Sequence, residues 1–417
     1  MGNLHTTGTK QALDVETIRS QFPILHQQVN SRPLIYFDNA ASNQKPELVI
    51  KALEHYYHCD HANIHRGVHT LAERATTAYE ETRKITADFI NAPEAEEVIF
   101  TKGTTEGINL VASAYGRAFL QEGDEVLISN MEHHSNIVPW QLLCEEKGLI
   151  LKVLPLKDNG EIKWEVLDQL LTPKTKMVSL VHASNTLGTI NPIKNVIRQA
   201  HDLGALVMID GAQAAAHLEI DVQDLDCDFY AFSSHKMYGP TGVGVLYGKR
   251  RLLEKMKPYQ GGGEMIKEVS FEGTTFSDIP HKFEAGTPNI ADVVAFKQAI
   301  EFIEGIGKSS IAAHEDQLLK QATEQWSKIP GFRAVGTAQQ KVAVLSFVME
   351  GIHHFDLGVM LDAKGIAVRT GHHCTQPLME CYGIEGTVRA SFSAYNTEEE
   401  VDIMSGHLKD ITNKLRS

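Results

Sequence analysis

Between residues 98 and 247 the sequence alternates short apolar runs, typical of β-strands, with segments of helical periodicity. One run, Leu206–Ile209, is continuously apolar, as expected of a strand buried on both faces of a parallel sheet. Alternation of this kind predicts a mostly parallel, doubly wound α/β sheet. Ligands bind beyond the carboxyl ends of the strands in such sheets, so functional side chains are expected there.

Polar side chains that could bind a ligand do follow the predicted strands. They are Thr104, Thr105, His133, Asn185, Asp210, Gln213 and Lys236. Lys236 stands in a polar turn between two apolar runs, and a buried ammonium group must be paired, neutralised or used covalently. A lone lysine in a Gly/Pro-rich turn is more often a surface residue. The alternative is a lysine that binds an aldehyde cofactor covalently.

A pyridoxal 5'-phosphate site needs such a lysine, a carboxylate for the ring nitrogen, a phosphate-binding turn and a group that stacks on the ring. Lys236, Asp210, the turn 103–105 and His133 supply these four parts. Each also has an ordinary interpretation, because Asp starts turns and Gly and Thr cap helices without any ligand. His133 and His134 could form a metal pair, but no further ligand stands at suitable spacing, so no metal site is predicted.

Composition narrows the class of protein. The 417 residues carry a net charge of −14, which makes nucleic acid an unsuitable partner, and no apolar run reaches membrane-spanning length. The five cysteines are odd in number and form no Cys-x-x-Cys pair, which favours a reducing compartment. The N-terminus lacks a signal-peptide pattern, and Met1–Thr6 matches only the loose myristoylation pattern. A cytoplasmic location is expected.

The pattern of elements predicts two domains. We expect a flexible tail over residues 1–14, an N-terminal segment over 15–30 that packs with the small domain, a large domain over 31–295 and a smaller α+β domain over 296–417. Residues 261–276, which begin with three glycines, are expected to form a flexible loop. Thr397–Glu400 forms a capping-box pattern that opens the last helix.

Five motifs resemble those of cysteine desulfurases, which are class V members of the fold-type-I, pyridoxal phosphate-dependent transferases. They are Met131–His134, Asp210–Gln213, Ser233–Gly242, Phe283–Asn289 and Arg369–Cys374. The last motif resembles the type II, SufS-like branch of the SUF system, and the similarity runs from about residue 15 to the C-terminus. The resemblance implies conversion of L-cysteine to L-alanine with a protein persulfide, sulfur supply for iron–sulfur cluster assembly and a selenocysteine lyase side activity. It also implies a homodimer and a sulfur-acceptor protein of the SufE or SufU type.

The motifs also imply roles for individual residues. Cofactor binding is assigned to Thr104, Thr105, His133, Asp210, Gln213, Ser233, His235, Lys236 and, reaching the phosphate of the partner subunit, Thr287. Substrate binding is assigned to His65, Asn185, Arg369 and Arg389. Arg389 would bind the substrate carboxylate through its guanidinium group. Lys236 would remove the Cα proton, and His133 would move a proton to or from the substrate sulfur.

Cys374 is the expected nucleophile, which would take the substrate sulfur as a persulfide. A free cysteine is most often a small core residue, the interpretation preferred for Cys144, Cys227 and Cys381. Cys374 instead follows Gly-His-His in a polar loop near Arg369, and such surroundings favour the thiolate. The loop could mimic a metal site, but adjacent residues rarely converge on one tetrahedral ion.

Two other functions stay open at this point. A class V aminotransferase or a kynureninase-like hydrolase would use the same cofactor without needing Cys374. A non-catalytic sulfur or metal scaffold would leave Lys236, Asp210 and the phosphate-binding turn unexplained.

Overall fold

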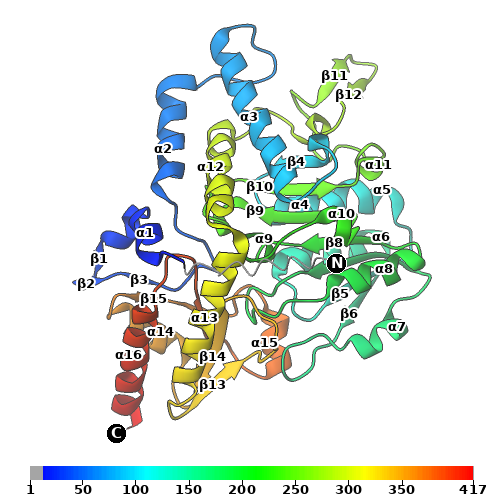
Figure 1. Cartoon of the computed structure of the whole chain (residues 1–417). Coiled ribbons are helices and arrows are strands. Elements are labelled where there is room, and N and C mark those ends of the chain that lie inside the picture. Colours follow the sequence, from blue (N-terminus) through cyan, green and yellow to red (C-terminus); the bar gives the residue numbers. More distant parts are fainter. Residues whose placement is uncertain (1–12, 417) are drawn as a thin grey trace, which may run out of the picture.

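A central sheet dominates the computed structural model, which describes residues 13–416 (Figure 1). Within these residues its strand order is β4-β10-β9-β8-β7-β5-β6. Strands β6, β5, β7, β8 and β9 run parallel to one another, whereas β10 is antiparallel to both β9 and β4. The mostly parallel sheet predicted from the sequence is confirmed. Its strands are β4 (Val98–Thr101), β5 (Glu125–Ser129), β6 (Ile150–Leu154), β7 (Thr175–Val181), β8 (Leu206–Asp210), β9 (Phe229–Ser233) and β10 (Gly244–Gly248).

Both faces of this sheet are buried. Alternate side chains of a strand point to opposite faces, so neighbouring residues can belong to different cores. Val207 and Ile209 belong to one core cluster, while Met208, between them, belongs to another. Helices α3 (Thr70–Phe89), α8 (Ile193–Asp202) and α12 (Ile290–Ile306) contribute to the first cluster. Helices α4 (Thr104–Val111) and α6 (Val138–Lys147) contribute to the second. The continuous apolar run of β8 therefore reflects two separate cores.

A second, antiparallel sheet has the order β13-β14-β17-β16 and packs against three helices. The predicted capping box at the start of α16 is confirmed, since the Thr397 N–H donates to Glu400 Oε2 and the Glu400 N–H donates to Thr397 Oγ1. The elements are β13 (Phe332–Val335), β14 (Val344–Met349), β16 (Arg369–Gly371), β17 (Thr387–Ser391), α13 (Lys308–Trp326), α14 (His354–Asp362) and α16 (Glu398–Arg416).

The N-terminal segment contacts elements from the C-terminal part of the chain. After α1 (Val15–Ser20), strand β3 (Ile35–Tyr36) pairs in parallel with β15 (Ile366–Ala367). Arg19 Nη2 lies 2.8 Å from Glu400 Oε1 of α16. Helix α12 runs without interruption through residue 295, the boundary expected from the sequence. The tail expected over 1–14 and the myristoylation pattern lie almost wholly outside the described residues.

One expectation about the fold was wrong. Residues 261–276 contain an antiparallel hairpin of β11 (Ile266–Val269) and β12 (Thr274–Phe276), where the sequence predicts a flexible loop. Nearly every residue of the two strands is exposed, so neither strand has a buried face. A hairpin without a buried face lacks the alternation of apolar and polar residues that identifies strands in a sequence.

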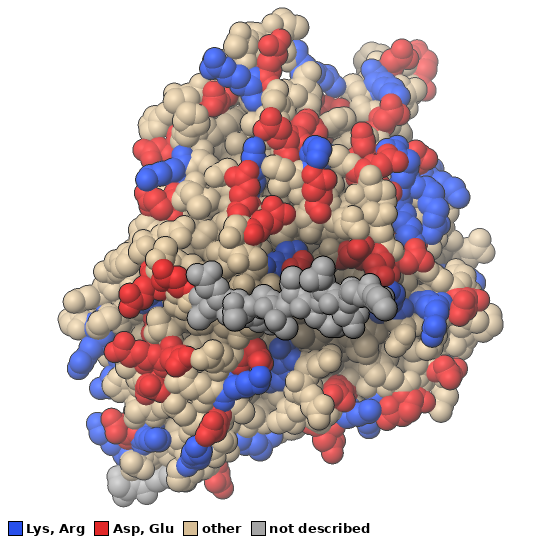
Figure 2. Space-filling view, in the orientation of Figure 1, with Lys and Arg blue, Asp and Glu red and all other residues tan. Residues whose placement is uncertain are grey.

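The remaining elements are short or peripheral. On the face shown in Figure 2, acidic and basic side chains are interspersed. No helix of the described residues is long and apolar enough to cross a membrane. These elements are β1 (Gln28–Val29), β2 (Arg32–Pro33), α2 (Glu47–His55), α5 (Arg117–Phe119), α7 (Leu167–Leu170), α9 (Ala214–His217), α10 (Val222–Leu225), α11 (Arg250–Leu253) and α15 (Gln376–Tyr382).

Candidate active site

A cavity of about 210 Å³ lies beyond the carboxyl ends of the parallel strands, where the sequence predicts it. Residues from both sheets line it. Of the residues singled out in the sequence, it is lined by Thr104, Thr105, His133, Asn185, Asp210, Gln213, Ser233, His235, Lys236, Arg369, Cys374 and Arg389. Two predicted residues, His65 and Thr287, are not part of this lining.

Lys236 ends the short 3₁₀ turn Ser234–Lys236 that follows β9. Burial lowers the pKa of its amine to about 8, an effect that the nearby Asp210 carboxylate opposes. Burial disfavours the charged form of a lysine, so the neutral amine is accessible near physiological pH. A neutral amine is the form that can react with an aldehyde or accept a proton.

Asp210 is the last residue of β8 and is only 2% exposed. Its Oδ1 accepts a hydrogen bond from the N–H of Ala212 at 2.9 Å. Burial raises the pKa of this carboxyl group. A protonated ring nitrogen beside Asp210 would compensate the buried charge, which is the pairing that pyridoxal phosphate needs.

The first turn of α4 forms one wall of the cavity. The Thr104 N–H donates to Ser233 Oγ at 2.8 Å, which joins the start of α4 to the end of β9. A Cβ atom at Gly244 of β10 would lie 2.3 Å from the Cα of Gly103, so only glycine allows this approach. The unbonded N–H groups of a first helical turn attract anions, and the Thr105 and Ser233 hydroxyl groups add donors. This wall suits a phosphate group.

His133 is held by Ser135. The Ser135 N–H donates to His133 Nδ1 at 3.1 Å, and Ser135 Oγ lies 2.7 Å from the same nitrogen. Because Nδ1 accepts, the proton of the neutral ring resides on Nε2. Burial, together with the charge of Lys236, lowers the His133 pKa to about 3. His133 is therefore a neutral ring that can stack on a cofactor and donate one hydrogen bond from Nε2.

Arg389 lies in β17 and faces the cavity from the second sheet. Its Nη2 lies 3.0 Å from Asp38 Oδ1, and its Nη1 donates to the carbonyl oxygen of Asn185 at 3.0 Å. Arg389 Nε and Asn185 Oδ1 are buried and have no hydrogen-bond partner among the described residues. Unpaired buried polar groups at a cavity are costly unless a ligand satisfies them. An α-amino acid offers the carboxylate and the ammonium group that these atoms need.

Cys374 lies in the loop between β16 and α15, and its side chain is exposed. His373 and Cys374 both have left-handed backbones, with φ of 55° and 58°. Non-glycine residues hold such conformations only where the surroundings enforce them. Asn185 Nδ2 donates to the His373 carbonyl oxygen and the His134 N–H donates to the Cys374 carbonyl oxygen, each at 2.8 Å. These two hydrogen bonds from the large domain thus hold the backbone at Cys374.

Sequence reasoning missed Asp38, Ser135 and Lys45. The Lys45 Nζ donates to the carbonyl oxygen of His235 at 3.2 Å, and this oxygen also accepts from Ser42 Oγ and the Asn43 N–H. Three donors thus converge directly before Lys236. Burial lowers the pKa of Lys45 to about 8. Asp38 opens the stretch 38–42, which the sequence predicts only as a polar turn, and Lys45 follows it. The residue types in this turn do not indicate the segment against which it packs.

His65 and Thr287 lie elsewhere. His65 Nε2 is 2.9 Å from Glu80 Oε1 of α3. Thr287 lines a separate cavity together with Lys102 and Tyr259. The roles expected of these two residues remain predictions, and the role of Thr287 concerns the cavity of the partner subunit.

Comparisons with known proteins agree with this geometry. The chain matches the family described as Aminotransferase class-V over residues 35–404. It is 50% identical over 390 residues to a probable cysteine desulfurase of Vibrio cholerae, covering 94% of this chain and 96% of that protein. It is 50% identical over 407 residues to a cysteine desulfurase of Synechococcus elongatus, but covers only 65% of that protein. It likewise covers 57% of a probable cysteine desulfurase of Mycolicibacterium paratuberculosis.

Among solved structures, the chain resembles the cysteine desulfurase CsdA of Escherichia coli with a TM-score of 0.90 and 41% identity. This match covers 97% of this chain and all of that one. The cavity also offers what pyridoxal phosphate requires: a half-buried lysine of lowered pKa, a buried carboxylate and a helix start suited to phosphate. The chain therefore belongs to the class V aminotransferase family and, within it, to the cysteine desulfurases, whose cofactor is pyridoxal phosphate.

Proposed function

We propose that this protein is a cysteine desulfurase that converts L-cysteine to L-alanine and carries the sulfur as a persulfide on Cys374. The observation that carries the proposal is the shared cavity of two unlike groups. The exposed Cys374 lines the same cavity as the half-buried Lys236. A transaminase needs only the lysine, whereas sulfur transfer needs both.

The residues of the chain divide the work. Bound pyridoxal phosphate supplies an electron sink for the charge that forms at the substrate Cα. Arg389 binds the substrate carboxylate, and its buried, unpaired Nε gives it a free donor. Lys236 takes the Cα proton, because its amine, with a pKa near 8, is available in the neutral form.

Cys374 completes the reaction. Its thiolate attacks the substrate sulfur, so that an S–S bond forms while the Cβ–S bond breaks. The electron pair of the broken bond stays with the carbon, and protonation there yields alanine. His133 donates a hydrogen bond from Nε2 to the substrate sulfur. With Nδ1 engaged by Ser135, donation is the role open to the neutral ring.

The finer parts of the proposal concern partners and substrates. The exposure of Cys374 supports handing the sulfur to an acceptor protein of the SufE or SufU type, for iron–sulfur cluster assembly in the cytoplasm. Selenocysteine would react in the same way, as a lyase side activity. A homodimer, in which Thr287 of one protomer reaches the phosphate bound by the other, would explain why Thr287 lies outside its own cavity.

Substitution of Cys374 by alanine tests the proposal. Cys374→Ala should keep the visible absorbance of the bound cofactor yet form no persulfide and release no alanine from L-cysteine. Cys381→Ala is the matched control, since Cys381 is also exposed but lies outside the cavity. Sulfur transfer that survives in Cys374→Ala would contradict the proposal.

The same assay separates the alternatives. An aminotransferase or kynureninase-like hydrolase would keep its turnover of amino-group acceptors or kynurenine-type substrates in Cys374→Ala. A non-catalytic scaffold would show no cofactor absorbance in the purified protein.

A further inference from the structure

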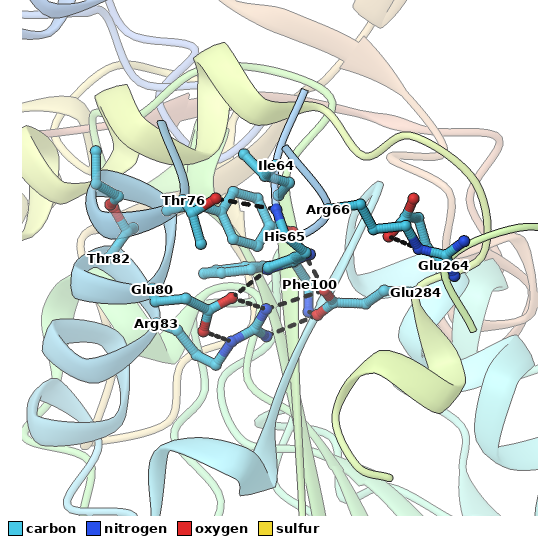
Figure 3. A network of polar contacts seen from close by, with 12 residues as sticks. Ile64, His65, Arg66, Thr76, Glu80, Thr82, Arg83, Phe100, Glu264 and Glu284 are labelled. Carbon is cyan, nitrogen blue, oxygen red and sulfur yellow. Dashed lines mark hydrogen bonds and ion pairs between the residues drawn. The ribbon is translucent and has the colours of Figure 1, made fainter. Parts of the chain in front are cut away.

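A second group of reactive side chains lies beside α3, outside the cavity that contains Lys236. It comprises His65, Glu80 of α3 and His281, which opens the 3₁₀ turn His281–Phe283. One ligand atom from each of the three residues lies within 4.8 Å of the other two. The rings of His65 and His281 have centroids 4.6 Å apart. Figure 3 shows His65 and Glu80 turned toward each other. All three residues are half-buried, so an ion could reach them from solvent.

A buried ion pair fixes the two elements that carry Glu80 and His281. Arg83, which is 1% exposed, donates through Nε to Glu80 Oε2 at 2.8 Å and through Nη1 to Glu284 Oε1 at 2.7 Å (Figure 3). Glu284 directly follows the turn that begins with His281, and it also accepts from the Phe100 N–H at the edge of the sheet. The positions of Glu80 and His281 are therefore set by protein contacts alone.

His65 is aimed at Glu80 by a strained backbone. Its φ is 68°, a left-handed value that is uncommon for a bulky residue. Thr76 Oγ1 accepts from the His65 N–H at 2.9 Å and holds this conformation against α3. The surrounding structure thus directs the imidazole into the group.

The donor set of two imidazoles and one carboxylate is one that zinc uses with three protein ligands. Tetrahedral bonds of about 2.1 Å place ligand atoms about 3.4 Å apart. Side-chain rotations that move the ligand atoms by about 1 Å would therefore suffice here. Arg83 would remain hydrogen-bonded to Glu80, the outer contact that metal-binding carboxylates usually keep. Glu80, Arg83 and Glu284 together carry −1 + 1 − 1 = −1, so the surroundings still attract a cation.

We propose that His65, Glu80 and His281 form a binding site for a zinc ion. The ion would join the loop that contains His65 to the segment 281–289 that contains Thr287. The sequence predicts no metal here, because the three ligands come from segments that only the fold brings together.

Zinc titration of the holoenzyme by isothermal calorimetry, with metal analysis after gel filtration, tests the site. A Cys374→Ser background removes the thiolate, which would bind zinc itself. Glu80→Gln removes the anionic ligand while keeping its size, and His281→Asn removes one imidazole. His55→Asn is the matched control, since His55 also faces a carboxylate, Asp60, at 3.2 Å but lacks a third ligand.

The parent and the His55→Asn control should retain one zinc ion per chain. Glu80→Gln and His281→Asn should bind zinc at least about tenfold more weakly. Glu80 also anchors Arg83, so circular dichroism is used to check that Glu80→Gln is folded. If Glu80→Gln is unfolded, the comparison of His281→Asn with the parent decides the test. Equal isotherms in all four proteins, or no retained zinc in the parent, would overturn the site.

Discussion

The Lys236 turn and the Cys374 loop face the same cavity but are built in opposite ways. Lys236 sits in a tight turn at the end of a buried strand, where it is half-buried and desolvation lowers the pKa of its amine. Cys374 sits in an exposed loop whose left-handed backbone is held by hydrogen bonds from the large sheet. The lysine is placed by the topology of one sheet, whereas the cysteine is placed by contacts between two.

This difference matches the two tasks. A lysine that holds a cofactor and takes a proton benefits from a dry site, which lowers its pKa. A thiol that must receive sulfur inside the cavity and release it to another protein has to be reached from outside. Burial therefore determines the pKa of Lys236, whereas the position of the loop determines which molecules can reach Cys374. Four experiments can break or sharpen this distinction.

Removal of the lysine should have the largest effect. Lys236→Ala should lose the covalent bond to the cofactor and at least about a thousandfold in alanine formation. Borohydride reduction followed by mass spectrometry measures the bond. A reduced cofactor adduct that persists on the variant would show that another lysine holds it.

The second experiment follows cofactor uptake against pH. Burial lowers the Lys236 pKa to about 8, so the reactive neutral amine should increase about tenfold per pH unit below pH 8 and then level off. Stopped-flow absorbance after mixing cofactor-free protein with pyridoxal phosphate gives the rate. A rate that still rises tenfold per unit toward pH about 10 would mean that the amine titrates like an exposed lysine.

The third experiment loosens the Cys374 loop by a substitution at Thr387, which does not itself line the cavity. Thr387 Oγ1 lies 2.7 Å from His373 Nε2, and both residues are buried. Thr387→Val leaves the imidazole nitrogen unpaired, which should cost about 1–3 kcal/mol of unfolding free energy. Persulfide formation should slow by about tenfold, with cofactor absorbance unchanged.

Thr412→Val is the control for this experiment. Thr412 is also buried, but it donates to Leu408 within α16, far along the chain from the loop. If Thr412→Val slows persulfide formation as much as Thr387→Val, the effect is one of general stability and the loop is not specially positioned.

The smallest effect is expected at Lys45. Lys45→Met removes one of three donors to the His235 carbonyl oxygen, so the Lys236 turn should shift slightly and kcat should fall by about threefold. Lys341→Met is the control, because Lys341 is likewise half-buried, with its pKa lowered to about 8, and donates to the Gly336 carbonyl oxygen elsewhere. Equal losses of kcat in both variants would exclude a positioning role for Lys45.

The sequence predicts the lysine side of the site better than the cysteine side. Asp210 and Lys236 follow apolar runs, and the rule that parallel strands present their carboxyl ends to ligands brings them together. Cys374 is exposed, and its loop accepts hydrogen bonds from Asn185 and His134. Both features depend on how the second sheet packs against the first, which no local sequence pattern indicates.

The residues that sequence reasoning missed share one property. Asp38, Lys45 and Ser135 act through contacts with segments distant in the sequence or through a backbone N–H, so their residue types alone carry no signal. The roles expected of His65 and Thr287 remain predictions, since both residues lie outside the cavity of their own chain.

The site of sulfur transfer tests the account most directly. Wild-type protein is incubated with ³⁵S-labelled L-cysteine, alkylated without reductant and digested, and the labelled peptide is identified by mass spectrometry. The label should reside on the peptide that contains Cys374, with alanine released in equal amount. Label on Cys381 or Cys59, the other exposed cysteines, would contradict the division of tasks between Lys236 and Cys374.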